Sequence, residues 1–433
     1  MIDTTIYPRL VEAHLREALD DSPAVLIHGP RQCGKTTLAR MVGASRGYRY
    51  VTFDDDVVRA AAADDPNGFA AALPDRTILD EVQKVPALFP ALKMEIDRRR
   101  TPGRFLLTGS THVLLVPRLS ESLAGRLRIL RLHPLAQCEL ERRDSHFPDA
   151  LFAGDFAVER TERLGDALPR RIVAGGYPAA LDRPPGRRRA SWYLDHVDAL
   201  IQRDVRDLTH VRRLEILPRL LAAAAGQTAR MFNVSRLAAP FEVTRPTIRD
   251  YATLLERVFL LERLPAWHGN RLTRLVKRPK LHVGDTGIAS ALLGLDGPAL
   301  AYDRALYGQL LETFVFQELR RQAGWHDARI SFHHFRDKDG AEVDIVLERG
   351  AAAVAGVEVK ASGTVRTGDF RGLRRLRGAL GRRFAGGVVL YDGEATAPFG
   401  DRLHAVPLRR LFQGSAELAT RRHKGTDFHS DGE

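Results

Sequence analysis

Cysteine is scarce in this chain, and long apolar runs are missing. Only two cysteines, Cys33 and Cys138, occur among 433 residues, which argues against a disulfide framework and against a zinc site built from cysteines. No apolar run approaches the roughly 18–20 residues that a membrane span requires, and residues 1–10 lack the apolar core of a signal peptide. The sequence therefore predicts a cytoplasmic protein that does not enter a membrane.

Acidic residues are outnumbered by basic ones. The chain has 66 Lys and Arg against 54 Asp and Glu, for a net charge of +12 and a pI of about 10.0. A basic balance suits polyanionic partners, DNA first. The Arg-rich and Ala-rich composition expected from a high-GC genome explains the same excess of basic residues. Charge alone therefore does not decide between a polyanionic partner and genome composition as the cause.

The length and the order of apolar patterns predict several domains in an α/β protein. In residues 1–140, short apolar runs (24–28, 49–53, 77–80, 104–108 and 128–132) alternate with helical stretches, which is typical of a parallel sheet covered by helices. Residues 150–290 are mostly helical in pattern. Residues 300–413 read as a helix, three strands, a helix and a strand, and a polar tail (414–433) is predicted to be disordered.

A phosphate-binding loop follows the first predicted strand. Residues 29–36, GPRQCGKT, fit the pattern G-x-x-x-x-G-K-[ST], with a strand before and a helix after. Backbone N–H groups of such a loop wrap a phosphate, and the helix N-terminus adds positive potential. We expect Lys35 to reach the β- and γ-phosphates of ATP and the Thr36 hydroxyl to ligate Mg²⁺. The residues expected to bind the nucleotide are Gly29, Pro30, Arg31, Gln32, Cys33, Gly34, Lys35, Thr36 and Thr37.

Two acids, Asp80 and Glu81, end the apolar strand at residues 77–80. Asp80 is expected to hold Mg²⁺ through water, and Glu81 to polarise the attacking water. A glutamate directly after the aspartate favours ATP hydrolysis over nucleotide binding alone.

The strand at residues 104–108 leads into small hydroxyl side chains. Thr108 and Ser110 would lie beside the γ-phosphate and sense it, or they form a plain turn at the strand end. Arg126 is a candidate finger donated to the nucleotide of a neighbouring subunit, which would require a homo-oligomer, but arginine is abundant here.

Cys33 lies inside the loop, near Lys35 and a helix N-terminus, both of which lower a thiol pKa. One interpretation is therefore a redox-sensitive thiolate. The other is a small residue that the loop tolerates, because this position contributes mainly its backbone.

Residues 214–284 resemble a winged helix-turn-helix. Helical patterns at 214–225 and 234–239 precede a third helix that Thr244 can cap, and 258–264 can pair with 280–283 as a wing. Arg245, Thr247 and Arg249 would then face a DNA groove. The alternative is that this module packs between domains and touches no DNA.

An acidic and basic constellation lies in the C-terminal region. Glu358 and Lys360 are two residues apart and so share one face of a strand, and Asp344 on the preceding strand can reach that face. The order Glu312, Asp344, Glu358, Lys360 looks like the restriction-endonuclease-like nuclease fold. In that fold Glu312, Asp344 and Glu358 would bind Mg²⁺ and Lys360 would help deprotonate the attacking water. Periodicity does not choose Glu312 over Glu318, and an inert remnant of such a site fits equally.

Over about residues 5–412 the chain resembles a widespread prokaryotic family of ATPases with an N-terminal AAA-type domain and a C-terminal domain of unknown function. The resemblance rests on residues 7–9, 29–37, 79–81, 107–110, 122–126, 175–178, 202–204, 285–287, 312, 340–344 and 358–360. The resemblance implies ATP binding, with an AAA-type domain at the N-terminal end of the chain and a second domain at the C-terminal end. Cys33 departs from the small aliphatic residue usual there.

The combined interpretation is an ATP-dependent, DNA-associated protein in which ATP gates the nuclease-like end. Two alternatives stay open. One is a nucleotide-gated regulator with an inactive C-terminal domain, and the other is an interaction protein that keeps ATP bound.

Overall fold

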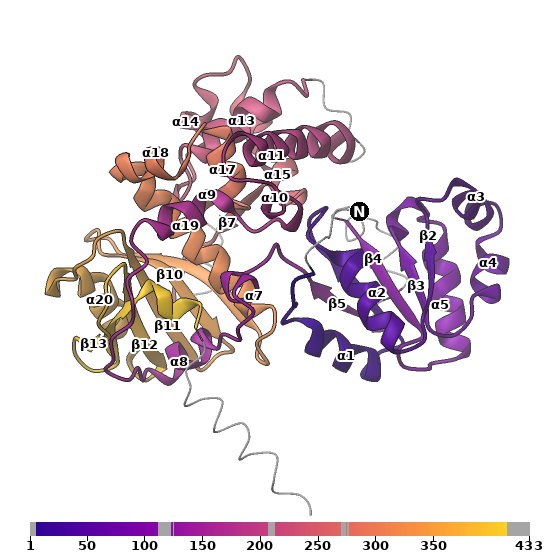
Figure 1. Ribbon diagram of the computed structural model, residues 1–433, viewed down its shortest axis with the longest axis horizontal. Helices are drawn as coiled ribbons and strands as arrows, with labels where there is room; N and C mark the ends of the chain where they lie inside the picture. Colours follow the sequence, from indigo (N-terminus) through magenta and orange to yellow (C-terminus); the bar gives the residue numbers. More distant parts are fainter. Residues whose placement is uncertain are drawn as a thin grey trace, which may run out of the picture.

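The computed structural model describes residues 6–110, 123, 125–206, 213–269, 274 and 277–413. Within these ranges the chain forms three sheets, of five, six and three strands, with helices around them (Figure 1). The α/β class expected from the sequence is confirmed. The tail predicted to be disordered, residues 414–433, lies outside the described residues. None of the helices in the described ranges is long and apolar enough to cross a membrane.

The N-terminal sheet is parallel throughout, in the order β2-β3-β4-β1-β5. Its strands are β1 (Ala24–His28), β2 (Arg49–Thr52), β3 (Thr77–Asp80), β4 (Phe105–Gly109) and β5 (Leu127–Arg131). Its helices are α1 (Glu12–Asp21), α2 (Lys35–Ser45), α3 (Asp56–Asp64), α4 (Pro66–Ala72) and α5 (Leu88–Arg98). Every residue of β1, β3 and β4 is buried, which explains why these strands read as continuous apolar runs. Because the carboxyl ends of parallel strands meet at one edge, the segments after these strands form one site.

A mainly helical unit follows. Two short helices, α7 (Gln137–Leu140) and α8 (Phe147–Ala153), come before it. Its own helices are α9 (Ala167–Ala174), α10 (Pro178–Leu181), α11 (Arg187–Ala199) with a π-helical continuation (Leu200–Val205), α13 (Ile216–Ala225), α14 (Val234–Ala238), α15 (Arg245–Arg257), α17 (Thr286–Leu292) and α18 (Gly297–Tyr302). Its sheet has the order β6 (Arg230–Met231), β8 (Lys280–Val283), β7 (Leu261–Leu264), all antiparallel. Thr244 caps α15 by accepting from the Thr247 amide, as its sequence position predicts.

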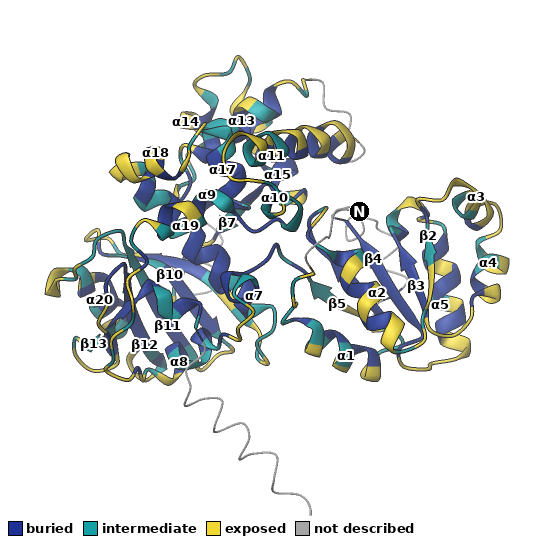
Figure 2. Cartoon of the chain, in the orientation of Figure 1, coloured by how far each residue is buried: buried dark blue, intermediate teal, exposed yellow. Residues whose placement is uncertain are grey.

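The C-terminal sheet has the order β13-β14-β12-β11-β10-β9. Its elements are α19 (Arg304–Ala323), β9 (Ile330–Arg336), β10 (Glu342–Arg349), β11 (Ala353–Lys360), α20 (Arg371–Leu380), β12 (Phe384–Tyr391), β13 (Ala397–Pro398) and β14 (Leu403–Pro407). Side chains of β10 alternate between two cores: Ile345 and Leu347 join the core that contains α19, and Val346 joins the core that contains α20. Figure 2 shows the strands of both large sheets mostly buried and the outer faces of their helices exposed.

The segment from α8 to Leu164 runs along the C-terminal sheet, although it precedes the helical unit in sequence. Asp392, at the end of β12, accepts from the Leu164 amide and pairs with Arg163. Arg160 forms an isolated bridge with Ala395. The chain therefore packs against the C-terminal sheet before it enters the helical unit.

A buried ion-pair network joins the three units around Arg321 on α19. Its guanidinium pairs with Glu318 (2.6 Å) and Asp285 (2.9 Å), and it donates to the Leu135 carbonyl beyond β5 (2.9 Å). The side chains of Arg321, Glu318 and Asp285 are 3%, 0% and 0% exposed. Buried charges of this kind are tolerated only when each has its partners.

We predict that Arg321→Met destabilises the protein by roughly 3–5 kcal/mol, because it leaves two carboxylates buried without their cation. Urea unfolding measures the effect as a lower midpoint. Arg382→Met is the matched control, since Arg382 is exposed, and it should change stability by less than about 0.5 kcal/mol. Equal midpoints for the two variants would contradict the assignment.

Candidate nucleotide site and its neighbours

The turn between β1 and α2 has the backbone geometry of an anion-binding loop. Gln32 and Gly34 adopt φ of 60° and 99° in the left-handed region. Helix α2 starts at Lys35, and among the described residues no side chain caps it. A Cβ on Gly29 would lie 2.0 Å from the Leu132 carbonyl oxygen, so only glycine fits there. Such a turn followed by uncapped helix amides suits a phosphate group.

Lys35 and Thr36 extend this loop toward the acids of β3. The buried Lys35 ammonium donates to the carbonyls of Gly29 (3.1 Å) and Pro30 (2.8 Å). The Thr36 hydroxyl donates to the Asp80 carboxylate at 2.9 Å. An ammonium over the loop and a hydroxyl beside a carboxylate are the donor set that a nucleoside triphosphate with Mg²⁺ needs, so these residues fit both groups.

The Asp80 carboxylate is the meeting point of three strands and the loop. It accepts from the hydroxyls of Thr36, Tyr50 (2.7 Å) and Thr108. Burial, together with the hydrogen bond to Asp80, raises the pKa of Tyr50 to about 12, so the phenol keeps its proton as a donor. Hydroxyl donors fix the carboxylate without neutralising its charge.

Glu81 is held in an unusual backbone conformation. Its φ is 55°, which is uncommon for a residue with a side chain and costs about 1–3 kcal/mol. Its carboxylate accepts from Gln83, whose amide nitrogen also donates to the Ser110 hydroxyl (3.1 Å). The Glu81 amide donates to Thr108 (3.3 Å). Glu81 is thus linked to the two hydroxyl residues in which the sequence places a phosphate sensor.

Arg126 lies at the start of β5 and pairs with Asp97 on α5, with Nε 2.6 Å from Oδ1. Its side chain is partly exposed. The hypothesis of a finger donated to a neighbouring subunit stays a prediction.

The thiolate interpretation of Cys33 is wrong. Burial raises the pKa of the Cys33 thiol and outweighs the opposite effects of Lys35 and Arg9. The thiol faces the Leu132 carbonyl oxygen at 3.6 Å. Desolvation therefore decides the state of this group, as a small buried side chain beneath the loop requires.

Two arginines hold the loop through contacts that the sequence did not predict, and Arg9 was not among the residues expected at the site. Arg9 donates to the carbonyls of Cys33 (2.7 Å) and His133 (2.6 Å), which ties the loop to the segment after β5. Arg31 pairs through Nε with Asp204 at 2.7 Å, and Asp204 is fully buried in the helical unit. No local spacing signals either contact, although Arg9 and Asp204 lie within the motifs of the family resemblance.

The C-terminal constellation contains a lysine that the motif did not include. Asp344 lies at a register shift of β10, where a bulge re-aims side chains. Lys280 from β8 places its ammonium 2.7 Å from Glu312 and 3.0 Å from Asp344. Glu358 and Lys360 pair with each other at 2.8 Å. Within the described ranges, no group of three or more His, Cys, Asp or Glu is arranged to hold a metal ion.

Both burial and neighbouring charges set the pKa values in this cluster. Burial opposes the charge of Lys280, but Asp344 and Glu312 outweigh it and raise the lysine pKa. Burial and the neighbouring Asp344 raise the pKa of Glu358 to about 8. Glu318, the alternative to Glu312, belongs to the Arg321 network instead.

The three residues expected to contact DNA all lie in the first turns of α15 but do not share one surface. Arg245 and Arg249 line a cavity with β7 and the chain before β8. Thr247 is not among its lining residues, and its hydroxyl lies 2.9 Å from that of Thr244.

A parallel sheet with this loop and this acid pair defines a P-loop ATPase fold of the AAA type. Residues 21–141 match the family model described as AAA domain. Residues 165–299 match a domain of unknown function (DUF8612), and residues 307–411 match another (DUF4143).

Two mycobacterial proteins share nearly the whole chain. The uncharacterized protein Rv2008c of Mycobacterium tuberculosis is 30% identical over 401 residues, which are 92% of this chain and 83% of the relative. The uncharacterized protein Mb2031c of Mycobacterium bovis gives the same values. This chain belongs to the same family as these two proteins.

Several solved ATPase structures are similar at lower levels. The Walker-type ATPase of Pyrococcus abyssi is 16% identical, with 68% of this chain and 100% of that chain covered and a TM-score of 0.40. AMPPCP-bound DnaA from Aquifex aeolicus is 14% identical, with 59% and 90% covered and a TM-score of 0.27.

We predict that native Cys33 reacts with iodoacetamide at pH 8 at least about tenfold more slowly than in the urea-unfolded chain, because burial keeps it a thiol. Mass spectrometry of the peptide that contains Cys33 measures both rates. The peptide of Cys138 is the internal control, since burial raises the pKa of that thiol as well. Rapid labelling of Cys33 in the folded protein would restore the thiolate interpretation.

Proposed function

We propose that this protein is an ATP-hydrolysing, DNA-associated regulator. The observation that carries the ATPase proposal is the position of the Asp80 carboxylate. It accepts a hydrogen bond from the Thr36 hydroxyl of the loop, and Glu81 directly follows Asp80 in the sequence. A nucleotide-binding loop beside a fixed acid pair is the minimum arrangement for hydrolysis by an activated water.

The residues of the site divide the work of ATP hydrolysis among phosphate binding, Mg²⁺ binding and activation of water. Loop amides and Lys35 would hold the β- and γ-phosphates, and Thr36 with Asp80 would hold Mg²⁺, which when bound offsets charge on the transferred phosphoryl group. Glu81 would take up the proton of the attacking water, with Gln83 fixing its carboxylate. Thr108 and Ser110 connect Glu81 to the end of β4.

We predict that Glu81→Gln lowers the ATP turnover rate by about 10²–10⁴-fold, because the amide cannot accept the proton. Nucleotide affinity should stay within about threefold, since Gln keeps the size and polarity of Glu. Phosphate release measures turnover, and a fluorescent ATP analogue measures affinity.

Two further variants make this test decisive. Lys35→Ala should lose nucleotide affinity itself, because it removes the cation that faces the phosphates. Glu17→Gln is the matched control, since Glu17 is exposed on α1, and it should match the wild type in both measurements. If turnover in Glu81→Gln equals that of the wild type, the interaction protein that keeps ATP bound becomes the better description.

Contacts between the loop and the helical unit support the idea that nucleotide state reaches the DNA-facing region. Burial lowers the pKa of His28 to about 4, so a neutral ring packs against Phe259, with centroids 5.2 Å apart. His28 directly precedes the loop, and Phe259 follows α15. Arg31 adds the ion pair to Asp204. A change in the loop would therefore reach the chain just beyond α15 and the π-helical continuation of α11.

For the C-terminal unit we favour a regulator with an inactive site over a nuclease. Lys280 provides the positive charge that Glu312 and Asp344 would otherwise take from a metal ion. Removing it would leave two largely buried carboxylates without the lysine that pairs with both of them.

A Mg²⁺-dependent nuclease remains the second candidate. The observation that favours it is Glu358 Oε2, a buried carboxylate oxygen that has no hydrogen-bond partner in the described parts of the chain. Together with Asp344 and Lys360 it keeps the residue types that cleavage requires.

We predict that Mn²⁺ without nucleotide leaves the wild-type melting temperature unchanged. Lys280→Ala should melt lower, and Mn²⁺ should restore part of the loss, because the freed carboxylates then bind the ion. Lys338→Ala, an exposed lysine, is the control and should behave like the wild type.

A cleavage assay separates the two candidates. Wild type, Asp344→Ala and Lys360→Ala are incubated with Mg²⁺ and a mixed DNA and RNA pool. Equal activity in all three, including none, supports the regulator. Cleavage by the wild type that both variants lose establishes the nuclease.

A further inference from the structure

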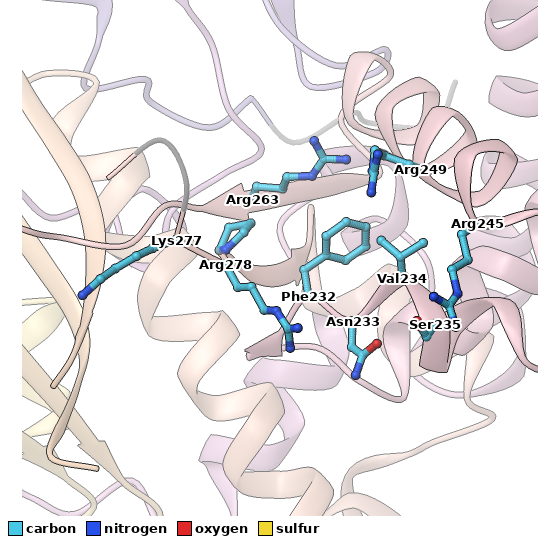
Figure 3. A pocket seen from close by; sticks show the side chains of 10 residues that line it. Phe232, Asn233, Val234, Ser235, Arg245, Arg249, Arg263, Lys277 and Arg278 are labelled. Carbon is cyan, nitrogen blue, oxygen red and sulfur yellow. The ribbon is translucent and has the colours of Figure 1, made fainter. Parts of the chain in front are cut away.

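A basic cavity of about 500 Å³ opens between α14, α15 and the small sheet (Figure 3). None of its described lining residues is acidic. They are Phe232, Asn233, Val234, Ser235, Arg245, Arg249, Arg263, Lys277, Arg278 and Pro279. In Figure 3, Arg245 and Arg249 approach from α15, Arg263 lies over the Phe232 ring, and Lys277 extends away at the rim.

One wall of the cavity is pre-organised. The Arg263 guanidinium lies 5.0 Å from the Phe232 ring centroid, in cation–π geometry. Its Nε pairs with Glu256 at 2.9 Å, and its Nη2 donates to Thr253 at 3.3 Å. A cation held on three sides loses little side-chain entropy when an anion binds.

Three other cations of the cavity have no acidic partner in the described parts of the chain. Across the described residues, no salt bridge links an acid to Arg245, Arg249 or Arg278, and the first two are exposed one helical turn apart on α15. Guanidinium groups that converge on a hollow without acidic partners repel one another, and an anion that bridges them relieves the repulsion.

We infer that this cavity binds the phosphodiester backbone of a single nucleic-acid strand. This inference rests on the proposed DNA association and names the form of nucleic acid. Phosphate oxygens accept from guanidinium forks in bidentate geometry. A duplex is read by a helix that projects into its groove, whereas here the α15 arginines face a concavity that a rigid duplex does not enter and a flexible strand does.

Fluorescence anisotropy with a labelled 20-nucleotide strand of mixed sequence, and with its duplex, tests the inference in the full-length protein. The single strand should bind at least about fivefold more tightly than the duplex. Arg245→Gln/Arg249→Gln should weaken strand binding tenfold or more, and should reduce the slope of log K against log salt by about 1.4, since each phosphate contact on a single strand contributes about 0.7. Arg278→Gln should weaken binding separately.

The control is Arg257→Gln/Arg382→Gln, which removes the same charge from two exposed arginines outside the cavity. Its affinity should stay within twofold of the wild type. Circular dichroism spectra and melting temperatures at wild-type values show that the cavity variants are folded.

The outcomes separate this inference from the proposed function. If the wild type binds neither strand nor duplex, DNA association itself fails. If it binds DNA but the cavity and control variants are equal, DNA association stands and the cavity is excluded. Tighter binding of the duplex than of the single strand would overturn the assignment to a strand. It would also be overturned if millimolar AMP or inorganic phosphate displaced the labelled strand as effectively as the unlabelled strand does.

Discussion

The charge of Arg321, buried where three parts of the chain meet, fixes how they are arranged. Its partners are a carboxylate of the helical unit, a carboxylate of α19 itself and a main-chain carbonyl beyond the first sheet. An unpaired guanidinium at this depth would cost several kcal/mol, so all these segments must converge for the fold to form. The Glu318 carboxylate also accepts a hydrogen bond from the Gln137 amide (2.9 Å), and the Asp285 carboxylate accepts one from the Gly176 amide (3.0 Å). The position of α19 follows, and with it the position of Glu312 on the same helix.

Helix α15 connects the two sites that the fold creates. Its first turns carry Arg245 and Arg249 into the basic cavity, and the chain just beyond its end carries Phe259 against His28, next to the nucleotide loop. Arg131 at the end of β5 also covers the Phe259 ring, with its guanidinium carbon 4.9 Å from the centroid. Since a helix moves as a rigid element, a shift at one end is felt at the other. If the two proposed ligands bind, α15 offers a short physical route for coupling between them.

The parts that sequence could predict are those that local pattern decides. Buried parallel strands read as apolar runs, and β1, β3 and β4 lie within about one residue of their expected places. The loop at residues 29–36 and the pair Asp80–Glu81 follow from spacing alone, and the structure brings them together at Thr36. Long-range contacts could not be predicted this way. Arg31 meets Asp204, and Lys280 meets Asp344, across separations that no periodicity encodes. For Cys33 the cationic sequence neighbours left two interpretations open, and the burial that only the folded chain creates favours the small tolerated residue over the thiolate.

The short segment from Lys277 to Lys280 faces two opposite electrostatic environments. Its first residues, Lys277 and Arg278, line the basic cavity, while Lys280, at the start of β8, reaches the carboxylates of Glu312 and Asp344. The segment is held in place by the Phe232 amide, which donates to the Pro279 carbonyl (2.8 Å), and by His334, whose ring nitrogen lies 3.1 Å from the Arg278 carbonyl oxygen. A strand of nucleic acid in the cavity would pull on the same few residues whose lysine neutralises the acid cluster. Any coupling free energy between binding in the cavity and the state of the carboxylates would act in both directions. Lys280 neutralises the acidic cluster from a position only two residues beyond Arg278, which lines the basic cavity.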